Sequence, residues 1–476
     1  MACKCSVKTA IAVMSAAVVN IDPIAEIDGI CTDSRKLQSG QLFVALVGEN
    51  FDGHEFVAQA IAQGAVAAVV QGDRFANQSD LPLLIVPDTL AAYQAIARWW
   101  RLECNLPVVA VTGSAGKTTT KELVAALLSY YTDPGKSVHK SAANYNNDIG
   151  VAQTLLAIEP SQHSFVVVEM GMRGPGEIAR LARVAQPTVS AITNIGTAHI
   201  GRLGSQEAIA AAKCELLEQT PAASIAVLNG EDRLLLQTAS RVWHGNTVTY
   251  SLADRIGGID DCDLNISTSV NGELEGDTLR VLGMSWQMPL PGRHNALNFL
   301  AALGVLQALG LDWQIAYQEA AHGIANFSMP SGRAQVHRLK DDVLILDETY
   351  NASPEATIAA LHLLASTPAR RRWAILGTMK ELGAMSNTLH TKIGETVASL
   401  GIDRLLVLLD GEANAILHGA GHDLSLVVGC ASHAEIVATL LKLVEPGDCL
   451  LFKASRSVGM DLAVQEFKQA WQTSKQ

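Results

Sequence analysis

The 476-residue sequence has few charged and few aromatic residues, at 17% and 5% respectively. It contains no block of basic residues, and its formal net charge is -12 at pH 7. These properties argue against a surface that binds nucleic acid or an anionic membrane. No apolar run approaches the ~20 residues that a transmembrane helix needs. We therefore expect neither a nucleic-acid partner nor membrane insertion.

Cysteine is also sparse, which argues against a disulfide framework. The eight cysteines are scattered, and the one close pair, Cys3 and Cys5, is too closely spaced for a usual zinc site. We therefore expect reduced thiols and a cytoplasmic location.

The N-terminus allows two interpretations. Lys4 and Lys8 precede the apolar run AIAVMSAAVV, an order that also occurs in secretory signal peptides. We favour a buried amphipathic helix, because the stretch CTDSRKL follows soon afterwards and looks like site chemistry that a mature chain keeps.

Hydrophobic residues make up 49% of the chain, which is typical of an α/β globular protein. The length suggests about three domains of ~150 residues each. Strand patterns around one helix predict a compact α/β module in residues 1–87. Alternating strands and helices predict a central doubly wound parallel sheet in residues 88–329. Further strands interleaved with helices predict a C-terminal Rossmann-like domain in residues 330–476.

The segment VAVTGSAGKTTT, residues 109–120, is a strand followed by a glycine turn and the start of a helix. Gly113 and Gly116 allow backbone N–H groups to point at an anion, and Lys117 and Thr118 follow as a phosphate ligand and a Mg²⁺ ligand. The usual G-x-x-x-x-G-K-[ST] spacing would place its first glycine at Val111, so the match is to a shorter form. The segment predicts an ATP or GTP site, with a turn that binds no ligand as the alternative.

Three polar residues follow the later strands of the predicted central sheet. Glu169 ends FVVVEMG, His199 follows AITNIGTAH, and Lys213 lies in the helix EAIAAAKCELLE. Each one alone is equally compatible with a structural role, and Lys213 with a helix-surface charge. Ligands bind at the carboxyl ends of the strands in such sheets, so together with the phosphate loop these side chains suit a Mg²⁺ site.

These features resemble the Mur ligase family, the ATP-dependent amide-forming enzymes of peptidoglycan precursor synthesis. The resemblance covers nearly the whole chain. Its landmarks, in chain order, are VTGSAGKTT, the glutamate after the next strands, TNIGTAHIGRLGS, AAAKCELL, PGRHNALN, SGRAQV and DETYNASP.

The resemblance implies an ATP- and Mg²⁺-dependent ligase whose catalytic residues are Lys117, Lys213 and Arg333. It further implies that CO₂ converts Lys213 into a carbamate, so that the metal ligands are Thr118, Glu169, His199 and the modified Lys213. The implied nucleotide-binding residues are Gly113, Ser114, Ala115, Gly116, Lys117, Thr118, Thr119, Asn295, Arg333 and Asp347.

Within the family, the chain is most similar to members that join D-alanyl-D-alanine to UDP-N-acetylmuramoyl-tripeptide through an acyl phosphate. The stretches TDSRKLQSGQLFVALVGENFDGHEF, SAANYNNDIG and LDETYNASP carry this similarity, and the DNPR motif of the diaminopimelate-adding members is absent. Ser353, Thr378 and Ala454 depart from residues that are frequent in the family. The implied substrate contacts are Ser34, Arg35, Asp52, Gly53, His54, Asn144, Asn147, Tyr350 and Lys453.

Three alternatives stay open. One is a tripeptide-forming member of the family, and another is a folylpolyglutamate-type ligase, although that type lacks a UDP module. The third is a P-loop switch without ligase activity, although the base-recognition motif N-K-x-D of GTPases is not present. We expect a monomer whose partners are its two peptide substrates.

Overall fold

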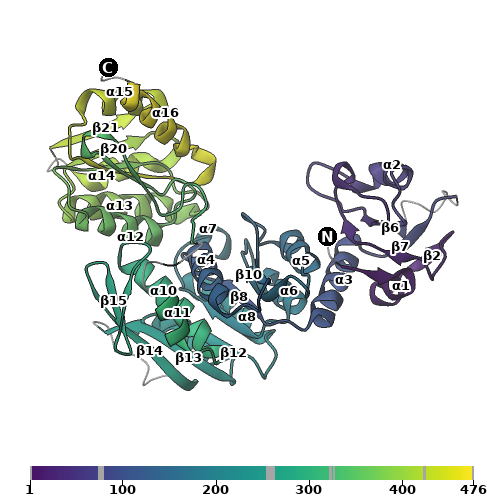
Figure 1. Cartoon of the computed structure of the whole chain (residues 1–476). Coiled ribbons are helices and arrows are strands. Elements are labelled where there is room, and N and C mark those ends of the chain that lie inside the picture. The colour runs from purple at the N-terminus through teal and green to yellow at the C-terminus, as the bar shows by residue number, and fades with distance from the viewer. Residues whose placement is uncertain are drawn as a thin grey trace.

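The computed structural model describes residues 3–72, 80–253, 263–320, 324, 327–421 and 425–473. The chain forms three lobes in sequence order, each built around its own sheet, and the central lobe lies between the other two (Figure 1). The predicted α/β class is confirmed.

The N-terminal lobe contains a five-stranded sheet of order β2-β7-β6-β5-β4, in which only β2 is antiparallel to its neighbour. The strands are β2 (Ala17–Val19), β4 (Ile30–Cys31), β5 (Leu42–Val44), β6 (Ala67–Gln71) and β7 (Leu83–Val86). The predicted N-terminal helix is shorter than expected: α1 (Val7–Met14) ends where Ser15 adopts a left-handed conformation, and Ala17–Val19 form a strand instead. Helix α2 (Val57–Ala62) follows a short 3-10 turn.

The central lobe begins with α3 (Thr89–Cys104), which starts there because the Asp88 side chain accepts hydrogen bonds from the N–H groups of Leu90 and Ala91. A nine-stranded sheet of order β16-β15-β14-β13-β12-β11-β8-β10-β9 follows. It is parallel from β9 to β14, and β15 and β16 add antiparallel edge strands. The strands are β8 (Val108–Thr112), β9 (Ser137–Lys140), β10 (His163–Glu169), β11 (Val189–Ile192), β12 (Ile225–Asn229), β13 (Asn246–Leu252), β14 (Asn265–Glu275), β15 (Thr278–Val281) and β16 (Met284–Gln287).

Helices cover both faces of the central sheet. Val109 and Val111 of β8 pack with α4 (Lys117–Leu128) and α10 (Arg293–Ala308), whereas Val108 and Ala110 pack with the opposite layer. That layer contains α5 (Asp148–Leu156), α6 (Glu177–Ala185) and α8 (Gln206–Glu218). This arrangement explains why successive residues of the strand are all apolar.

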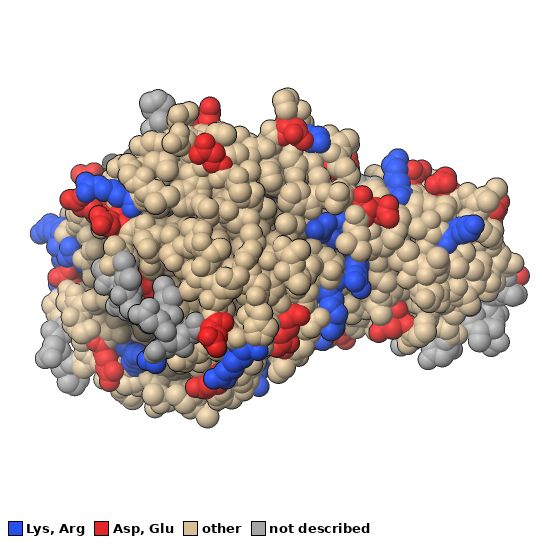
Figure 2. All heavy atoms as spheres, turned by 90° about the horizontal axis from the view of Figure 1, so that it is seen from below, with Lys and Arg blue, Asp and Glu red and all other residues tan. Residues whose placement is uncertain are grey.

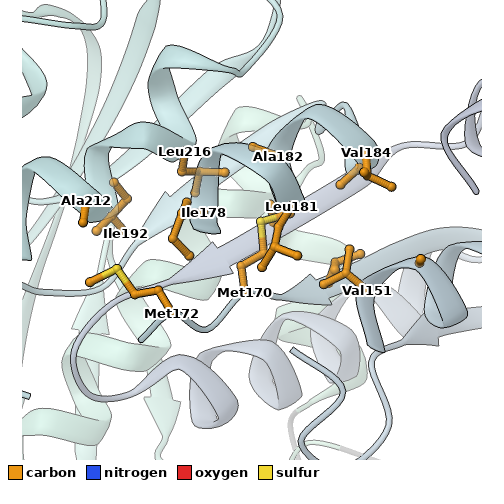
Figure 3. Close-up of a cluster of buried hydrophobic side chains, with 14 of the residues drawn as sticks. Val151, Met170, Met172, Ile178, Leu181, Ala182, Val184, Ile192, Ala212 and Leu216 are labelled. Carbon is orange, nitrogen blue, oxygen red and sulfur yellow. The ribbon is translucent and has the colours of Figure 1, made fainter. Parts of the chain in front are cut away.

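The hydrophobic cluster of this second layer supports the ends of two site-bearing elements (Figure 3). Met170 follows Glu169 at the end of β10, and Ala212 precedes Lys213 on α8; both apolar side chains are buried in the cluster. Burial of the flanking residues therefore fixes the backbone at Glu169 and Lys213.

The C-terminal lobe has a six-stranded sheet of order β17-β18-β22-β19-β20-β21, in which only β17 is antiparallel. The strands are β17 (Gln335–Arg338), β18 (Leu344–Asp347), β19 (Arg372–Leu376), β20 (Arg404–Leu408), β21 (Leu426–Cys430) and β22 (Cys449–Lys453). Its helices include α12 (Pro354–Ser366), α13 (Ser386–Ser399), α14 (Asn414–Ala420), α15 (His433–Leu443) and α16 (Met460–Thr473).

The surface agrees with the charge pattern of the sequence. On the face seen in Figure 2, acidic and basic side chains are interspersed among uncharged ones, without a broad basic patch. No helix in the described part of the chain is long and apolar enough to cross a membrane. Seven cysteines are free and buried, and Cys262 lies outside the described residues.

Candidate active site

The phosphate loop joins β8 to α4, and its two glycines are required by close packing. Gly113 has φ 149°, and a Cβ atom there would lie 1.8 Å from Thr193 Oγ1. Gly116 has φ 81°, and its Cβ would lie 2.4 Å from Asn298 Oδ1. The N–H of Ala115 donates to Asn194 Oδ1 at 2.9 Å, which fixes the middle of the loop. The loop is therefore held in shape by the protein itself.

Lys117 lies at the start of α4 and folds back over the loop. Its Nζ donates to the carbonyl oxygens of Gly113 at 2.8 Å and Ser114 at 3.3 Å. Burial lowers the pKa of Lys117, the Glu169 carboxylate opposes this effect, and the positive charge of Arg333 lowers the pKa further. Lys117 and Arg333 therefore share one electrostatic environment although they belong to different lobes.

Glu169 lies at the carboxyl end of β10, where two neighbouring segments hold its carboxylate. Thr118 Oγ1 donates to Oε2 at 2.8 Å, and Asn146 Nδ2 donates to Oε1 at 2.9 Å. Lys121 Nζ lies 3.9 Å from Oε2. The glutamate is only 2% exposed, so these contacts compensate for the cost of burying its charge.

Lys213 and His199 approach the same region from the elements that follow β11. Lys213 is 2% exposed, so it is not a surface charge. Burial lowers its pKa well below the usual value, and the charge of Lys117 lowers it further. Among the described residues, no Asp or Glu forms an ion pair with Lys213. Burial also lowers the pKa of His199, whose Nδ1 lies 2.5 Å from Glu381 Oε2 of the C-terminal lobe.

The C-terminal lobe contributes a second group of cations. The guanidinium carbon of Arg333 lies 3.8 Å from the centre of the Tyr350 ring. Lys453 Nζ donates to the Asn351 carbonyl at 3.1 Å and lies 3.6 Å from Glu348 Oε2. Lys453 is buried at the end of β22, and this burial lowers its pKa.

A cleft of about 2860 Å³ between the central and C-terminal lobes brings most of the predicted site residues together. Those that line it are Ser114, Ala115, Gly116, Lys117, Thr118, Thr119, Asn144, Asn147, Glu169, His199, Lys213, Asn295, Arg333, Tyr350 and Lys453. Gly113 and Asp347, both among the described residues, are not part of this lining. The Asp347 carboxylate instead accepts hydrogen bonds from the N–H and hydroxyl of Thr349, at 3.2 and 2.6 Å.

The predicted substrate contacts of the N-terminal lobe lie apart from this cleft. A smaller pocket of about 380 Å³ is lined by Cys31, Thr32, Asp33, Lys36, Gln38, Gln41, Tyr145 and Gln153. Of the described residues, Ser34, Arg35, Asp52, Gly53 and His54 line neither pocket. Arg35 is next to the smaller one, where its guanidinium donates to both carboxylate oxygens of Asp33 at 2.8 and 2.9 Å.

Both ring nitrogens of His54 contact other groups of the N-terminal lobe, so the side chain has a structural role here. Its Nε2 accepts from the Gln71 N–H at 3.0 Å, and its Nδ1 lies 2.6 Å from Asp52 Oδ1. Because Nε2 is an acceptor here, the ring proton sits on Nδ1 and donates to the carboxylate. A Cβ at Gly53 would lie 2.7 Å from the Leu46 carbonyl oxygen. In this structure the DGH sequence closes the loop after β5.

Sequence reasoning missed several residues that build the site. Asn146 holds Glu169, Asn194 holds the phosphate loop, and Glu355 accepts from Thr197. Asn146 and Asn194 lie inside the motifs SAANYNNDIG and TNIGTAHIGRLGS, so membership of these motifs was the signal that could have pointed to them. No pattern pointed to Glu381 or to the buried Lys121.

The donor set of the cleft matches part of a Mg²⁺ site. Oxygen ligands suit Mg²⁺, which usually takes one or two protein ligands and completes its shell with phosphate oxygens and water. The Thr118 hydroxyl and the Glu169 carboxylate, 2.8 Å apart, fit this pattern. No group of three His, Cys, Asp or Glu side chains that could hold a metal occurs among the described residues. The protein alone therefore offers a partial shell that a phosphate ligand would complete.

Comparisons with known proteins identify the family of the chain. Three family models match the chain. The model "Mur ligase family, catalytic domain" matches residues 26–129, and "Mur ligase middle domain" matches residues 111–306. The model "Mur ligase, glutamate ligase domain" matches residues 332–456. A UDP-N-acetylmuramoyl-tripeptide--D-alanyl-D-alanine ligase of Synechocystis sp. is 46% identical, with 94% of each chain covered.

Two solved structures share the whole architecture. A MurF crystal structure from Acinetobacter baumannii has a TM-score of 0.84 at 27% identity, covering 98% of this chain and 99% of that one. The MurF ligase of Thermotoga maritima in complex with ADP has a TM-score of 0.78 at 29% identity, with 93% and 97% covered. Matches of this extent leave one assignment: the chain is an enzyme of the Mur ligase family.

Proposed function

We propose that this enzyme joins D-alanyl-D-alanine to UDP-N-acetylmuramoyl-tripeptide at the expense of ATP, in peptidoglycan synthesis. The observation that carries the proposal is the crowding of Lys117, Arg333, Lys213 and His199 around the phosphate loop, in a cleft shared by two lobes. Burial and mutual repulsion lower the pKa of Lys117, His199 and Lys213, and an anionic ligand such as a polyphosphate would stabilise their charged forms. The 46% identical relative carries this activity in its name, and the MurF structure with ADP supports ATP as the nucleotide.

The reaction requires charge neutralisation more than covalent catalysis. A carboxylate oxygen of the tripeptide attacks the γ-phosphorus of ATP, the bond from that phosphorus to the β–γ bridging oxygen breaks, and ADP leaves. The amine of the dipeptide then attacks the carbonyl carbon of the acyl phosphate and loses a proton, and the bond to phosphate oxygen breaks to release inorganic phosphate. Crowded anions are the obstacle, and fixed cations lower it.

The described residues can divide this task between the lobes. The N–H groups of the phosphate loop and Lys117 would bind the β- and γ-phosphates, and Arg333 would approach them from the C-terminal lobe. The cations Lys453 and Arg333 next to Tyr350 would orient the dipeptide. We propose that residues 1–87 bind the sugar nucleotide and that residues 88–329 bind ATP. Residues 330–476, a Rossmann-like domain, would contact the dipeptide.

We further propose that Thr118, Glu169 and His199 hold Mg²⁺ and that Lys213 contributes as a carbamate. Mg²⁺ would neutralise negative charge on the phosphate oxygens. A buried amine with a lowered pKa is more often uncharged at neutral pH, which is the form that reacts with CO₂. Modification would place a carboxylate near the positive charge of Lys117, in place of an amine whose protonated form Lys117 repels.

Loop 141–147 lies between the two pockets, and this supports a path for the peptide. Asn144, Asn146 and Asn147 line the large cleft, whereas Tyr145 lines the small pocket next to residues 31–41 of the N-terminal lobe. A UDP group bound at the small pocket would therefore have its peptide cross this loop to reach the phosphate loop. We keep Ser34 and Arg35 as predicted contacts on this side, and a monomeric cytoplasmic enzyme as the expected state.

Phosphate release and product mass test the proposal together. With ATP, Mg²⁺ and UDP-N-acetylmuramoyl-tripeptide, we expect release to require D-alanyl-D-alanine and the product to carry its mass. Diaminopimelate or lysine with the UDP-dipeptide is the matched reaction, and turnover there instead would identify a tripeptide-forming ligase. Nucleotide binding without either amide product would identify a switch.

A further inference from the structure

Lys121 is a fully buried lysine one turn after Lys117 on α4, with 0% of its surface exposed. Its Nζ donates to the Ser141 carbonyl at 3.0 Å, lies 3.1 Å from Glu122 Oε1 and lies 3.9 Å from Glu169 Oε2. The three oxygens belong to three different segments: the start of loop 141–147, α4 itself and the end of β10. One ammonium group therefore joins all three.

The charges around Lys121 alternate along a chain. Glu169, Lys121, Glu122 and Lys140 follow one another, and Lys140 Nζ contacts Glu122 Oε2 at the outer end. The side chains of Glu169, Lys121 and Glu122 are 3, 1 and 7% exposed, whereas that of Lys140 is 39% exposed. Burying such charges is costly, and replacing a buried ion pair by apolar side chains is often neutral or stabilising for a fold. Stability alone therefore does not explain a lysine at this position.

Loop 141–147 is attached to Glu169 at two further points. The Glu169 N–H donates to Ser141 Oγ at 3.1 Å, and Asn146 Nδ2 donates to Glu169 Oε1. The Asn146 carbonyl accepts from the Gly171 N–H at 2.8 Å. The loop thus crosses the end of β10, with Lys121 holding its first residue.

We propose that Lys121 is a positioning residue that ties loop 141–147 and the Glu169 carboxylate to the phosphate-loop helix. Resting on the proposed function, this means that Lys121 sets where the tripeptide carboxylate arrives relative to the γ-phosphate. The same group would keep Glu169 aligned with Thr118. Lys121 lines neither pocket, so it acts through the loop and the glutamate.

Lys121→Met is a clean test, because it leaves both acids with a partner. Glu122 keeps Lys140, and Glu169 keeps Thr118 and Asn146. Because Glu169 loses its ion pair with Lys121, we expect a lower melting temperature, and exchange and kinetics are measured well below it. In the free protein, amide hydrogen exchange in residues 141–147 should become about tenfold faster, while that of α5 stays unchanged. In the kinetics, the KM for UDP-tripeptide should rise about tenfold and the KM for D-alanyl-D-alanine should stay near the wild-type value.

Lys140→Met is the matched control. It removes the Nζ that pairs with Glu122, whereas the Ser141 carbonyl keeps its donor Lys121. Its exchange and KM values should stay near wild type. Lys121→Gln keeps one donor for the Ser141 carbonyl and should recover part of the loop protection; it also replaces Lys121→Met if that variant does not fold. Wild-type exchange in 141–147, or an unchanged KM for UDP-tripeptide, would overturn the proposal. If the wild type forms no amide, the proposed function fails, and the exchange measurement still decides whether Lys121 anchors the loop.

Discussion

Thr197 donates both its N–H and its hydroxyl to one carboxylate oxygen of Glu355, at 2.6 and 2.8 Å, and so connects the central lobe to α12 of the C-terminal lobe. The neighbouring Gly196 leaves no room for a side chain, because a Cβ there would lie 2.6 Å from the Glu355 carboxyl carbon. Glu381 makes a second connection to the same loop through His199 and Arg202. Contacts from the C-terminal lobe, which also carries Arg333, therefore hold the loop that carries His199.

Replacing Glu355 tests this connection. Glu355→Ala leaves the Thr197 donors without their acceptor, which costs about 1–3 kcal/mol when such groups stay buried. We expect lower stability in urea and a lower kcat/KM, because Arg333 is less well placed. Glu355→Gln keeps an acceptor and should lie close to wild type, and Glu395→Ala, on the exposed face of α13, is the neutral control. Wild-type stability of Glu355→Ala would show that the contact contributes nothing.

The phosphate loop should not tolerate a methyl group at Gly116. Gly116→Ala combines an unfavourable left-handed backbone, at about 1–2 kcal/mol, with a contact 2.4 Å from Asn298 Oδ1. Gly135→Ala has nearly the same φ, 80°, but nothing within 4 Å of the new Cβ. We expect Gly116→Ala to be clearly less stable than Gly135→Ala in thermal melts and to lose ATP binding. Equal melting temperatures would contradict the packing argument.

Lys117→Ala should separate catalysis from folding. The lysine is half-buried and desolvation disfavours its charged form, so its removal should leave the melting temperature unchanged or slightly higher. The γ-phosphate would lose its main side-chain cation, and we expect kcat to fall about 100-fold or more. Phosphate release provides the measurement, with Lys392→Ala on the surface of α13 as control. Near-normal turnover would remove Lys117 from the catalytic set.

Lys213→Ala should nearly abolish activity, and formate should restore part of it by supplying the missing carboxylate. In the wild type supplied with ¹³C-bicarbonate, we expect a carbamate carbon signal in NMR that is absent from Lys213→Ala. The amine attacks CO₂ and releases one proton, so burial that lowers the pKa of Lys213 favours the step. Loss of activity without rescue and without the carbon signal would rule out the carbamate.

Two histidines that do not line the cleft should make the stability depend on pH. His139 and His163 lie with ring centres 4.7 Å apart, and burial lowers the pKa of both from 6.5. The unfolded chain therefore binds these protons at higher pH than the native protein does. Stability should fall as pH drops below the ordinary histidine pKa and stop falling once the native rings are protonated.

His139→Gln keeps a donor for the Thr154 carbonyl, which His139 Nε2 contacts at 2.9 Å. We expect it to reduce the slope of unfolding free energy against pH in that acidic window, as read from urea curves at several pH values. His418→Gln, on α14 of the C-terminal lobe, is the control. An unchanged slope in His139→Gln would mean that the pair does not titrate with folding.

Much of the fold followed from local patterns. Helix α3 begins where Asp88 caps it, and the strands around the phosphate loop are apolar throughout because both faces of the sheet are covered. The prediction failed where local signals were weak. Ser15 ended α1 early, and β2 took the place of the last residues expected in that helix.

The sequence by itself determined the phosphate loop, its glycines, Lys117, Thr118 and the order of the motifs, because these depend on residues adjacent in the chain. Tertiary structure alone decided that Glu355 accepts hydrogen bonds from Thr197 and that Arg333 is close enough to lower the pKa of Lys117. It also decided that Lys121, which the helix pattern leaves as an ordinary charge, is fully buried against Ser141 and Glu169. Such contacts join segments far apart in sequence, and their energies depend on burial and on distances that only the packing of the lobes sets.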